Sequence, residues 1–251
     1  MPATELARRI KLAPPGSVLD LAHEPMGAQS LDRFDGLNIT VRGGLFDSLN
    51  LFRVPNLAIE SPLIQMVFEP SIYDRDGALI KGGTATVSAA FRAKECPRVR
   101  LIGDARLIGC FATTGVTEEG SAKLDKTGNA IGFPTGTAVR IEASPDSVID
   151  GIEGEQFAVG VVHVGSANAL IRRAALSRLR TTGFKASGAS GYRLEYSSLT
   201  DSRPWAYGDT MRGGDHAAGV HLSTTIGSQS MARVILYRNA FIQGAGAPLI
   251  A

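Results

Sequence analysis

The chain repeats a short pattern of alternating hydrophobic and polar residues along most of its length. In each repeat, two hydrophobic residues flank one intervening residue, and in three late repeats a further hydrophobic residue follows five positions on. Alternation with a period of two is typical of β-strands, whose successive side chains point to opposite faces. The repeated triplets are Leu37–Ile39, Leu57–Ile59, Val99–Leu101, Val139–Ile141, Ala169–Ile171, Tyr192–Leu194 and Val234–Leu236.

A second, shorter alternation precedes most of these triplets, for example at Val162–Val164 and Val220–Leu222. A sandwich or barrel also contains many short strands, but its strands would not normally come in ordered pairs with a constant offset. The pattern favours a solenoid, in which each coil buries its hydrophobic residues against the coils above and below. We therefore predict an all-β fold, a right-handed parallel β-helix solenoid of about seven coils.

The same pattern predicts a single domain over residues 1–251. Residues 1–16 form an N-terminal cap, in which a short amphipathic helix from Thr4 to Ile10 covers the strand edges that the first coil would otherwise expose. Where the repeat is interrupted we expect loops, the first with a β-hairpin around Asp74–Gly77. The predicted loop segments are 68–83, 111–135 and the long lateral loop 200–218.

Composition narrows the class of protein without identifying it. The chain is 44% hydrophobic and 20% charged, which excludes an intrinsically disordered protein. Its 26 Lys and Arg against 24 Asp and Glu leave a net charge of +2, so no overall field attracts nucleic acid or anionic lipid. No hydrophobic run approaches the ~20 residues that span a bilayer. We expect neither nucleic acid nor membrane as a partner.

Motifs for metal or nucleotide chemistry are absent from the sequence. The four histidines have no zinc-binding spacing, and there is no P-loop, dinucleotide-binding glycine motif or serine nucleophile elbow. Cys96 and Cys110 are more simply explained as two small core thiols than as a disulfide. We therefore expect no metal and no cofactor.

The alternation also assigns side chains to the inner or outer face. On the outer face next to the inward triplet residues, charges of both signs alternate, which indicates a solvated, salt-bridged surface. On the other strand of the repeat, His163, Lys185 and His221 fall in one outward column. Stacked hydrogen-bond donors of this kind are less common on a sheet face, so this column is a candidate functional surface.

Two motifs in the C-terminal third lie on consecutive predicted strands. The residues concerned are Gly214, Asp215, His216, Val220, Val234, Leu236, Asn239 and Phe241. They resemble the G-D-H-x-D and V-x-I-x-x-N-x-F strands of the pectate-lyase-like superfamily of right-handed β-helix proteins. Ala218 stands where that resemblance expects a second acidic residue, which removes one carboxylate from the loop. The resemblance covers about 50 residues and implies the fold rather than the chemistry.

Proteins of this superfamily commonly bind or cut polysaccharides in a groove along the outside of the helix, walled by long loops. The resemblance therefore implies that loop 200–218 borders a glycan-binding groove. Aromatic rings can stack on sugars, and arginines can form paired hydrogen bonds with a uronate carboxylate. The candidate glycan-binding residues are Arg203, Trp205, Tyr207 and Arg212.

If the protein is an enzyme, the same region supplies its catalytic groups. Lyase chemistry needs a base beside a neutralised carboxylate, and Lys185, His216 and His221 are candidates for it. Asp209 and Asp215 are candidates for the paired carboxylates of a hydrolase. The alternative for such residues is structural, since a single loop tryptophan commonly anchors packing and an aspartate commonly stabilises a turn.

We predict a structural and binding role in a larger assembly, most specifically a phage virion, as a spike or capsid decoration protein. The sequence shows no N-terminal export signal, and virion proteins leave the host cytoplasm by lysis. The last residues look like the first strand of a further coil, which favours a homo-oligomer, with a trimer expected, or neighbouring virion subunits. A lateral face would bind surface polysaccharide. The alternative is a polysaccharide lyase or glycoside hydrolase that acts on an acidic polysaccharide.

Overall fold

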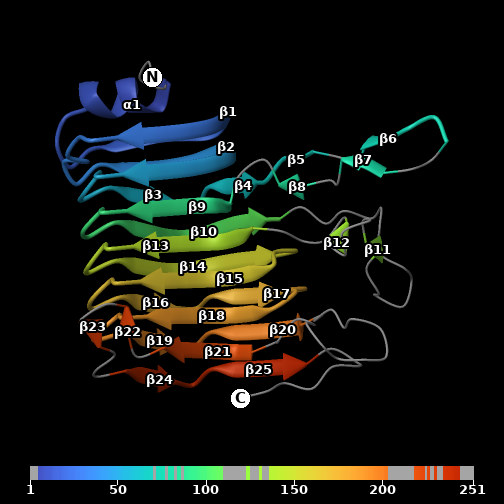
Figure 1. Ribbon diagram of the computed structural model, residues 1–251. Helices are drawn as coiled ribbons and strands as arrows, with labels where there is room; N and C mark the ends of the chain where they lie inside the picture. Colours follow the sequence, from blue (N-terminus) through green and yellow to red (C-terminus); the bar gives the residue numbers. More distant parts are fainter. Residues whose placement is uncertain are drawn as a thin grey trace.

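The structure of the chain, a computed structural model, is all-β in its described residues apart from one short helix (Figure 1). The helix, α1 (Glu5–Leu12), lies at the N-terminal end of a stack of strands. No helix within the described part of the chain is long and apolar enough to cross a membrane. The described residues are 5–69, 72–76, 79–81, 84–85, 88–109, 123–124, 130–131, 136–202, 218–223, 225–226, 229–230 and 234–243.

The main sheet contains 17 strands, which pair in parallel in three rows that we call ladders 1, 2 and 3. Each pass of the chain adds one strand to each ladder in turn, and the long strands contribute to more than one. Each pass lies directly against the pass before it, so that Ile171 aligns with Leu194 although 23 residues separate the two in the sequence. Parallel neighbours require such a return of the chain, because a tight hairpin can join only antiparallel strands.

The strands of each ladder follow one another in space as they do in the chain. Ladder 1 contains β1 (Val18–Asp32), β2 (Thr40–Phe52), β3 (Ala58–Glu60), β10 (Arg100–Ile108), β14 (Val148–Glu155), β16 (Leu170–Arg172), β19 (Arg193–Glu195) and β24 (Ile235–Tyr237). Ladder 2 combines parts of β2, β10 and β14 with β4 (Leu63–Gln65), β17 (Ala175–Ser177), β20 (Ser198–Ser202) and β25 (Ala240–Gln243). Ladder 3 joins the end of β2 to β9 (Ala89–Lys94), β13 (Thr137–Glu142), β15 (Val159–Val164), β18 (Thr182–Ser187) and β21 (Ala218–Ser223).

Short antiparallel pairs stand outside the ladders. The hairpin predicted around Asp74 is present, because Tyr73 pairs with Leu79 across it. The strands of this hairpin are β6 (Ile72–Tyr73) and β7 (Leu79–Lys81). The other described antiparallel pairs have two-residue strands. They are β5 (Phe68–Glu69) with β8 (Thr84–Ala85), β11 (Lys123–Leu124) with β12 (Ala130–Ile131), and β22 (Thr225–Ile226) with β23 (Gln229–Ser230).

The core runs along the inside of the three ladders and consists of inward aliphatic and aromatic residues. Each such side chain contributes roughly 1.5–3 kcal/mol when it is removed from water. In ladder 1 the aligned inward residues are fully buried from Val41 to Leu194, whereas Leu19 of β1 is half-buried and Leu236 at the other end of the row is 49% exposed. The buried members of this row are Val41, Ile59, Leu101, Ile149, Ile171 and Leu194.

The helix closes the N-terminal end of the core, as predicted from its amphipathic pattern. Leu6, Ala7 and Ile10 are buried on the underlying strands, and Arg9 forms an ion pair with Glu24 of β1 at 2.6 Å. Hydrogen bonds from Arg8 and Arg9 lower the pKa of Glu5 at the start of the helix to about 2. The helix begins at Glu5 and ends two residues beyond the predicted Ile10, and Thr4 lies outside the described residues.

Small polar side chains connect successive passes at a corner between ladders 3 and 1. The Cys96 N–H donates to Ser144 Oγ at 2.9 Å, and the Ser144 N–H donates to Ser166 Oγ at 3.0 Å. The Cys96 thiol accepts the Val54 N–H, and burial raises the pKa of this thiol. Cys96 is free, and its predicted companion Cys110 lies outside the described residues.

Three register predictions are wrong. The triplet Leu37–Ile39 precedes β2, and Val41 takes the predicted place of Ile39 because it aligns with Ile59. His163 points inward and is fully buried, because Val162 occupies the outward position that aligns with Lys185. The triplet Val139–Ile141 belongs to ladder 3, and Ile149 takes its predicted place in ladder 1. A shift of one residue exchanges inner and outer faces, so the alternation alone does not decide between the two settings.

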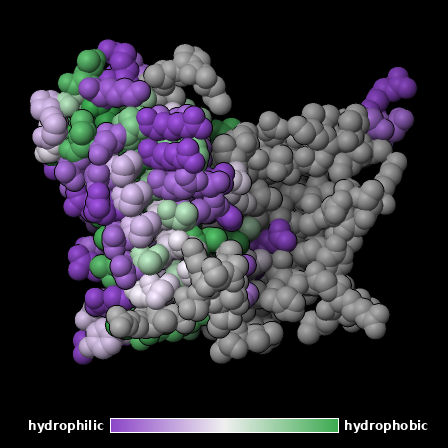
Figure 2. Space-filling model, turned by 60° about the vertical axis from the view of Figure 1, so that its left-hand side comes forward, coloured by the Kyte–Doolittle hydropathy of each residue, from purple (hydrophilic) through white to green (hydrophobic). Residues whose placement is uncertain are grey.

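Ion pairs cover the outward face of ladder 1, as the mixed charges predicted. Arg42 pairs with Glu60 at 3.0 Å, and Asp150 pairs with Arg172 at 2.7 Å. Burial opposes the ionisation of Asp150, but hydrogen bonds from Arg173 and Arg172 outweigh it and hold the pKa of this carboxyl below its ordinary value. Hydrophilic residues also dominate the described part of the surface in Figure 2.

Candidate functional site

Most of the functional residues predicted from the sequence lie where the structure describes nothing. Strand β20 extends to Ser202, and the chain is described again from Ala218 in β21. The loop prediction 200–218 therefore overlaps the ends of strands that belong to ladders 2 and 3. The predicted residues outside the described part are Arg203, Trp205, Tyr207, Asp209, Arg212, Asp215 and His216.

Lys185 and His221 are the two predicted site residues that the structure describes. They are aligned neighbours on the outward face of ladder 3, with Lys185 half-buried and His221 exposed. Neither forms an ion pair with any described residue. The column continues through Val162 to Arg140 and Arg92, both of which hydrogen-bond to Glu142. The structure thus brings Lys185 and His221 together, while His163 lies behind them in the core.

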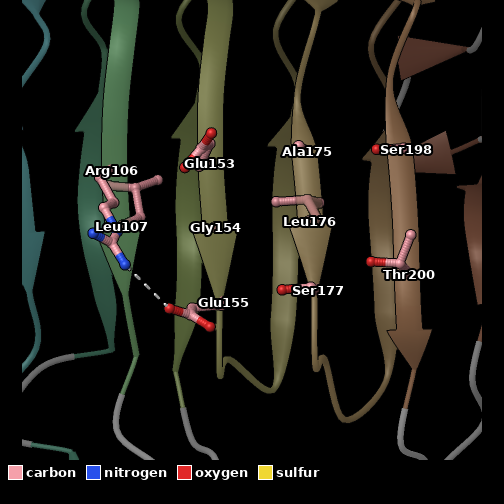
Figure 3. Close-up of a pocket in the computed structure, with 10 residues that line it drawn as sticks. All are labelled: Arg106, Leu107, Glu153, Gly154, Glu155, Ala175, Leu176, Ser177, Ser198 and Thr200. Carbon is pink, nitrogen blue, oxygen red and sulfur yellow. Dashed lines mark ion pairs between the residues drawn. The ribbon is translucent and has the colours of Figure 1, made fainter. Parts of the chain in front are cut away.

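A groove with a polar lining lies on the outward face of ladder 2 (Figure 3). It has a volume of about 290 Å³ and crosses strands β10, β14, β17 and β20. Small residues on the last two strands leave the space, because their side chains barely rise above the sheet. The outward residues that line the groove are Arg106, Glu153, Glu155, Ala175, Ser177, Ser198 and Thr200.

Register places these groups in two columns across the groove. Arg106 aligns with Glu153, and Ile108 aligns with Glu155 one step further along the strand pair. Glu155 in turn aligns with Ser177, and Ser177 with Thr200. The two glutamates are two residues apart on β14, so they face the same side with Cα atoms about 6.6 Å apart.

The two glutamates differ in their electrostatic surroundings. Arg106 Nη2 lies 3.8 Å from Glu155 Oε1, and Arg178 Nη1 lies 3.6 Å from Glu155 Oε2. Figure 3 draws the first of these ion pairs across the groove. Glu153 is exposed and forms no ion pair with any described residue. The groove therefore offers one carboxylate that arginines neutralise and one that is available to a ligand.

This set of groups can hold a ligand rich in hydroxyls. Carboxylates accept hydrogen bonds, guanidinium groups donate them, and serine and threonine hydroxyls do both. The residues stand on paired strands, and such sites are held more firmly than sites on loops. The described chain stops after Gly109 and after Ser202, which lie at or next to the carboxyl ends of the parallel strands β10 and β20 of this ladder.

Sequence reasoning missed Arg106, Glu153 and Glu155. The signal was present, because Glu153 and Glu155 alternate with the inward residues Ile152 and Gly154. Arg106, however, aligns with these glutamates only when residues 110–135 are left out of the repeat. The length of that segment obscures the spacing between Arg106 and the glutamates.

Comparisons with known proteins place few limits on the function. No protein-family model matches the chain, and no curated protein matches it. A solved structure of a "putative glycosyl hydrolase" from Parabacteroides merdae ATCC 43184 is similar at 14% sequence identity. The match covers 79% of this chain and 82% of that chain, with a TM-score of 0.40. A TM-score this low does not assign the two chains to one fold family.

Proposed function

We propose that this protein binds a carbohydrate chain in the groove of ladder 2, and that its three ladders form a right-handed parallel β-helix. The observation that carries the proposal is the row of outward groups over four adjacent strands, with an arginine, two carboxylates and three hydroxyls. Sugars present closely spaced hydroxyls, which such a row can engage at several points.

The rigidity of the groove supports this proposal. Neighbouring strands repeat at roughly 4.8 Å, so the polar groups recur at intervals fixed by the backbone. A site that is already ordered loses less conformational entropy when it binds a flexible chain. The residues predicted from the sequence, Arg203, Trp205, Tyr207 and Arg212, belong to the same proposal as further glycan contacts.

The resemblance to pectate-lyase-like proteins remains part of the proposal and concerns the fold. Asn239 of the matching motif accepts the Ser197 N–H at 2.9 Å and donates to the Leu194 carbonyl at 2.9 Å. Phe241 packs against the core beside Phe184. These two motif residues connect consecutive passes, so they support a repeated architecture. The proposed ligand binding rests on the groove and not on these residues.

Hydrolysis is the alternative function, favoured by the unequal surroundings of Glu153 and Glu155. Glycoside hydrolases use two carboxyl groups with different roles, and different environments set those roles. In this alternative Glu153, which forms no ion pair with any described arginine, protonates the leaving oxygen. Glu155, held between Arg106 and Arg178, acts as the base or nucleophile. Lys185, His216 and His221 remain the candidates for lyase chemistry, and Asp209 with Asp215 for a second carboxylate pair.

Glycan binding is tested by calorimetry against a panel of neutral and acidic polysaccharides. We expect at least one to bind, and Glu153→Gln to weaken it about tenfold or more, because a hydrogen bond to a charged group contributes roughly 1.5–3 kcal/mol. Glu60→Gln on the outward face of ladder 1 is the control and should bind as the parent does.

The same panel separates binding from catalysis. New reducing ends that disappear in Glu153→Gln would establish the hydrolase alternative. Unsaturated ends would indicate a lyase instead. Equal affinities of Glu153→Gln and Glu60→Gln for the polysaccharide would show that the groove is not the binding site. If no polysaccharide of the panel binds, the proposed function is wrong.

We further propose that the protein works inside a larger assembly, with a phage virion as its location and a homotrimer as its form. In the part of the chain that the structure describes, β24 is the last strand of ladder 1 and pairs with β19 alone. Its residues Ile235, Leu236 and Tyr237 are 45%, 49% and 44% exposed, which supports self-association. An unpaired strand edge with apolar side chains readily pairs with another chain. Neighbouring virion subunits are the alternative partners.

Light scattering tests the assembly. We expect a stable trimer or larger species, and we expect Leu236→Glu to dissociate it because the carboxylate would be buried in the contact. Leu12→Glu, at an exposed leucine of α1, is the control and should leave the mass unchanged. A chain that is monomeric at high concentration would rule out the homo-oligomer.

A further inference from the structure

A second hollow lies on the outward face of ladder 2, beside the groove and closer to the N-terminal end of the stack. We call it the apolar hollow. It has a volume of about 840 Å³, within the range of small-molecule sites. Half-buried or exposed aliphatic side chains from β2, β4 and β10 contribute to its lining. The aliphatic residues that matter here are Leu45, Leu63, Val67 and Ile108.

The hollow and the groove are continuous on the sheet. Leu63 aligns with Arg106, and Gln65 aligns with Ile108. Ile108 lines the hollow, while Arg106 on the same strand lines the groove. Ile108 also aligns with Glu155, so the apolar lining meets the charged lining across a single pair of strands. A ligand that lies along the stack would therefore pass directly from one to the other.

We propose that the apolar hollow binds an acyl substituent on the carbohydrate chain that occupies the groove. This inference rests on the proposed function and specifies its ligand as an acylated glycan. The groove can bind sugar hydroxyls, but Leu45, Leu63 and Ile108 have no polar group to offer them. Their exposed surface gains about 25 cal/mol for each Å² that an apolar group covers.

The mixed lining favours an acyl group over a purely hydrocarbon ligand. Three polar side chains also line the hollow, those of Asp47, Gln65 and Gln156, and the two amides can hydrogen-bond to an ester or amide linkage. Continuity with the groove favours a substituent of the sugar chain over a separate protein segment. The hollow thus has a place for the apolar chain, and its polar members can engage the linkage that joins that chain to the sugar.

Calorimetry with octyl β-glucoside and methyl β-glucoside, below the micelle-forming concentration of the former, tests the inference. We expect the octyl compound to bind at least tenfold more tightly, since each buried methylene adds about 0.8 kcal/mol. Equal affinities, or no detectable binding of the octyl compound, would overturn the inference.

Two variants on one strand locate the effect. Ile108→Gln places an amide in the hollow and should remove the preference for the octyl compound. Ile102→Gln is a matched control, because Ile102 is an equally half-buried outward isoleucine of β10 that faces ladder 1. The control should keep the preference, and a preference that survives Ile108→Gln would contradict the assignment.

The outcomes also separate this inference from the proposed function. A polysaccharide that binds and is sensitive to Glu153→Gln, together with equal affinities for the two glucosides, would leave the function standing without the acyl site. An octyl preference lost in Ile108→Gln, with no polysaccharide bound, would show an apolar site without the glycan groove. If an apolar peptide bound in the hollow in place of the glucoside, the hollow would be assigned to a protein partner. This result would overturn the acyl assignment.

Discussion

Gly160→Ala is expected to lower the free energy of unfolding by about 3 kcal/mol, and the melting temperature by about 10 °C for a chain of this length. A Cβ atom at this position would lie 2.3 Å from the Gly183 carbonyl oxygen and 2.5 Å from Leu176 Cδ1. Backbone of the next pass cannot move away without separating the strands, so the clash must be relieved by distortion of the ladder. Thermal and urea denaturation followed by circular dichroism measure the loss.

The effect has its cause in how ladders 2 and 3 meet. Gly183 and Gly219 occupy the same place in the following passes, where Leu199 and Phe241 lie within 2.9 Å of the position of an added Cβ. Large residues of one ladder thus fill the space that glycines of the next ladder leave open.

Gly16→Ala is the control for Gly160→Ala. No atom lies within 4 Å of a Cβ at Gly16, whose positive φ of +75° adds only backbone strain of about 1 kcal/mol. If Gly160→Ala cost no more than Gly16→Ala, ladders 2 and 3 would not pack as closely as the structure has them.

Acid is expected to destabilise the protein through His163, by about 2 kcal/mol between pH 6.5 and 4.5 and by about 5 kcal/mol in all. Burial lowers the pKa of His163 to about 3, from an ordinary value of 6.5. The imidazole Nε2 lies 3.4 Å from Ser147 Oγ, and Nδ1 has no hydrogen-bond partner. The centroids of the His163 and Tyr192 rings lie 5.7 Å apart, in an edge-to-face arrangement. No carboxylate among the described residues forms an ion pair with His163.

The direction follows from where the proton binds. Between pH 6.5 and 3 the unfolded chain binds a proton at this histidine and the folded chain does not, so stability falls as the pH falls. The stabilising effect is complete above pH 6.5. Carboxyl groups with lowered pKa values, such as Glu142 and Asp150, lose their contribution only below about pH 4.5. Among the described groups with a lowered pKa, His163 is therefore the one that contributes between pH 6.5 and 4.5.

Urea denaturation at a series of pH values measures this dependence. His163→Gln cannot ionise and should flatten the profile between pH 6.5 and 4.5, whatever its effect on stability at neutral pH. His221→Gln, at the exposed neighbour of Lys185 on ladder 3, should leave the profile of the parent. A steep profile that persists in His163→Gln would mean that another group takes up the proton.

The candidate site was partly accessible from the sequence. Lys185 and His221 were placed on one outward face, and the structure aligns them. Arg106, Glu153 and Glu155 were missed, because their proximity depends on which passes are neighbours. Seven of the predicted residues, among them Trp205 and His216, lie outside the described part of the chain and remain predictions.

The amino-acid sequence by itself determined the all-β class, the amphipathic helix and most inward residues of ladder 1. These depend on local alternation and on hydrophobicity, which are properties of short segments. Only the tertiary structure decided the register. The segment Val139–Ile141 and the segment around Ile149 have equally good alternating patterns, so either could supply the inward residue of ladder 1. In the same way, the pattern allows either Val162 or His163 to point inward. Contacts between passes determine which of these residues points inward. A fully buried imidazole needs neighbours such as Ser147 and Tyr192, which are distant from His163 in the chain.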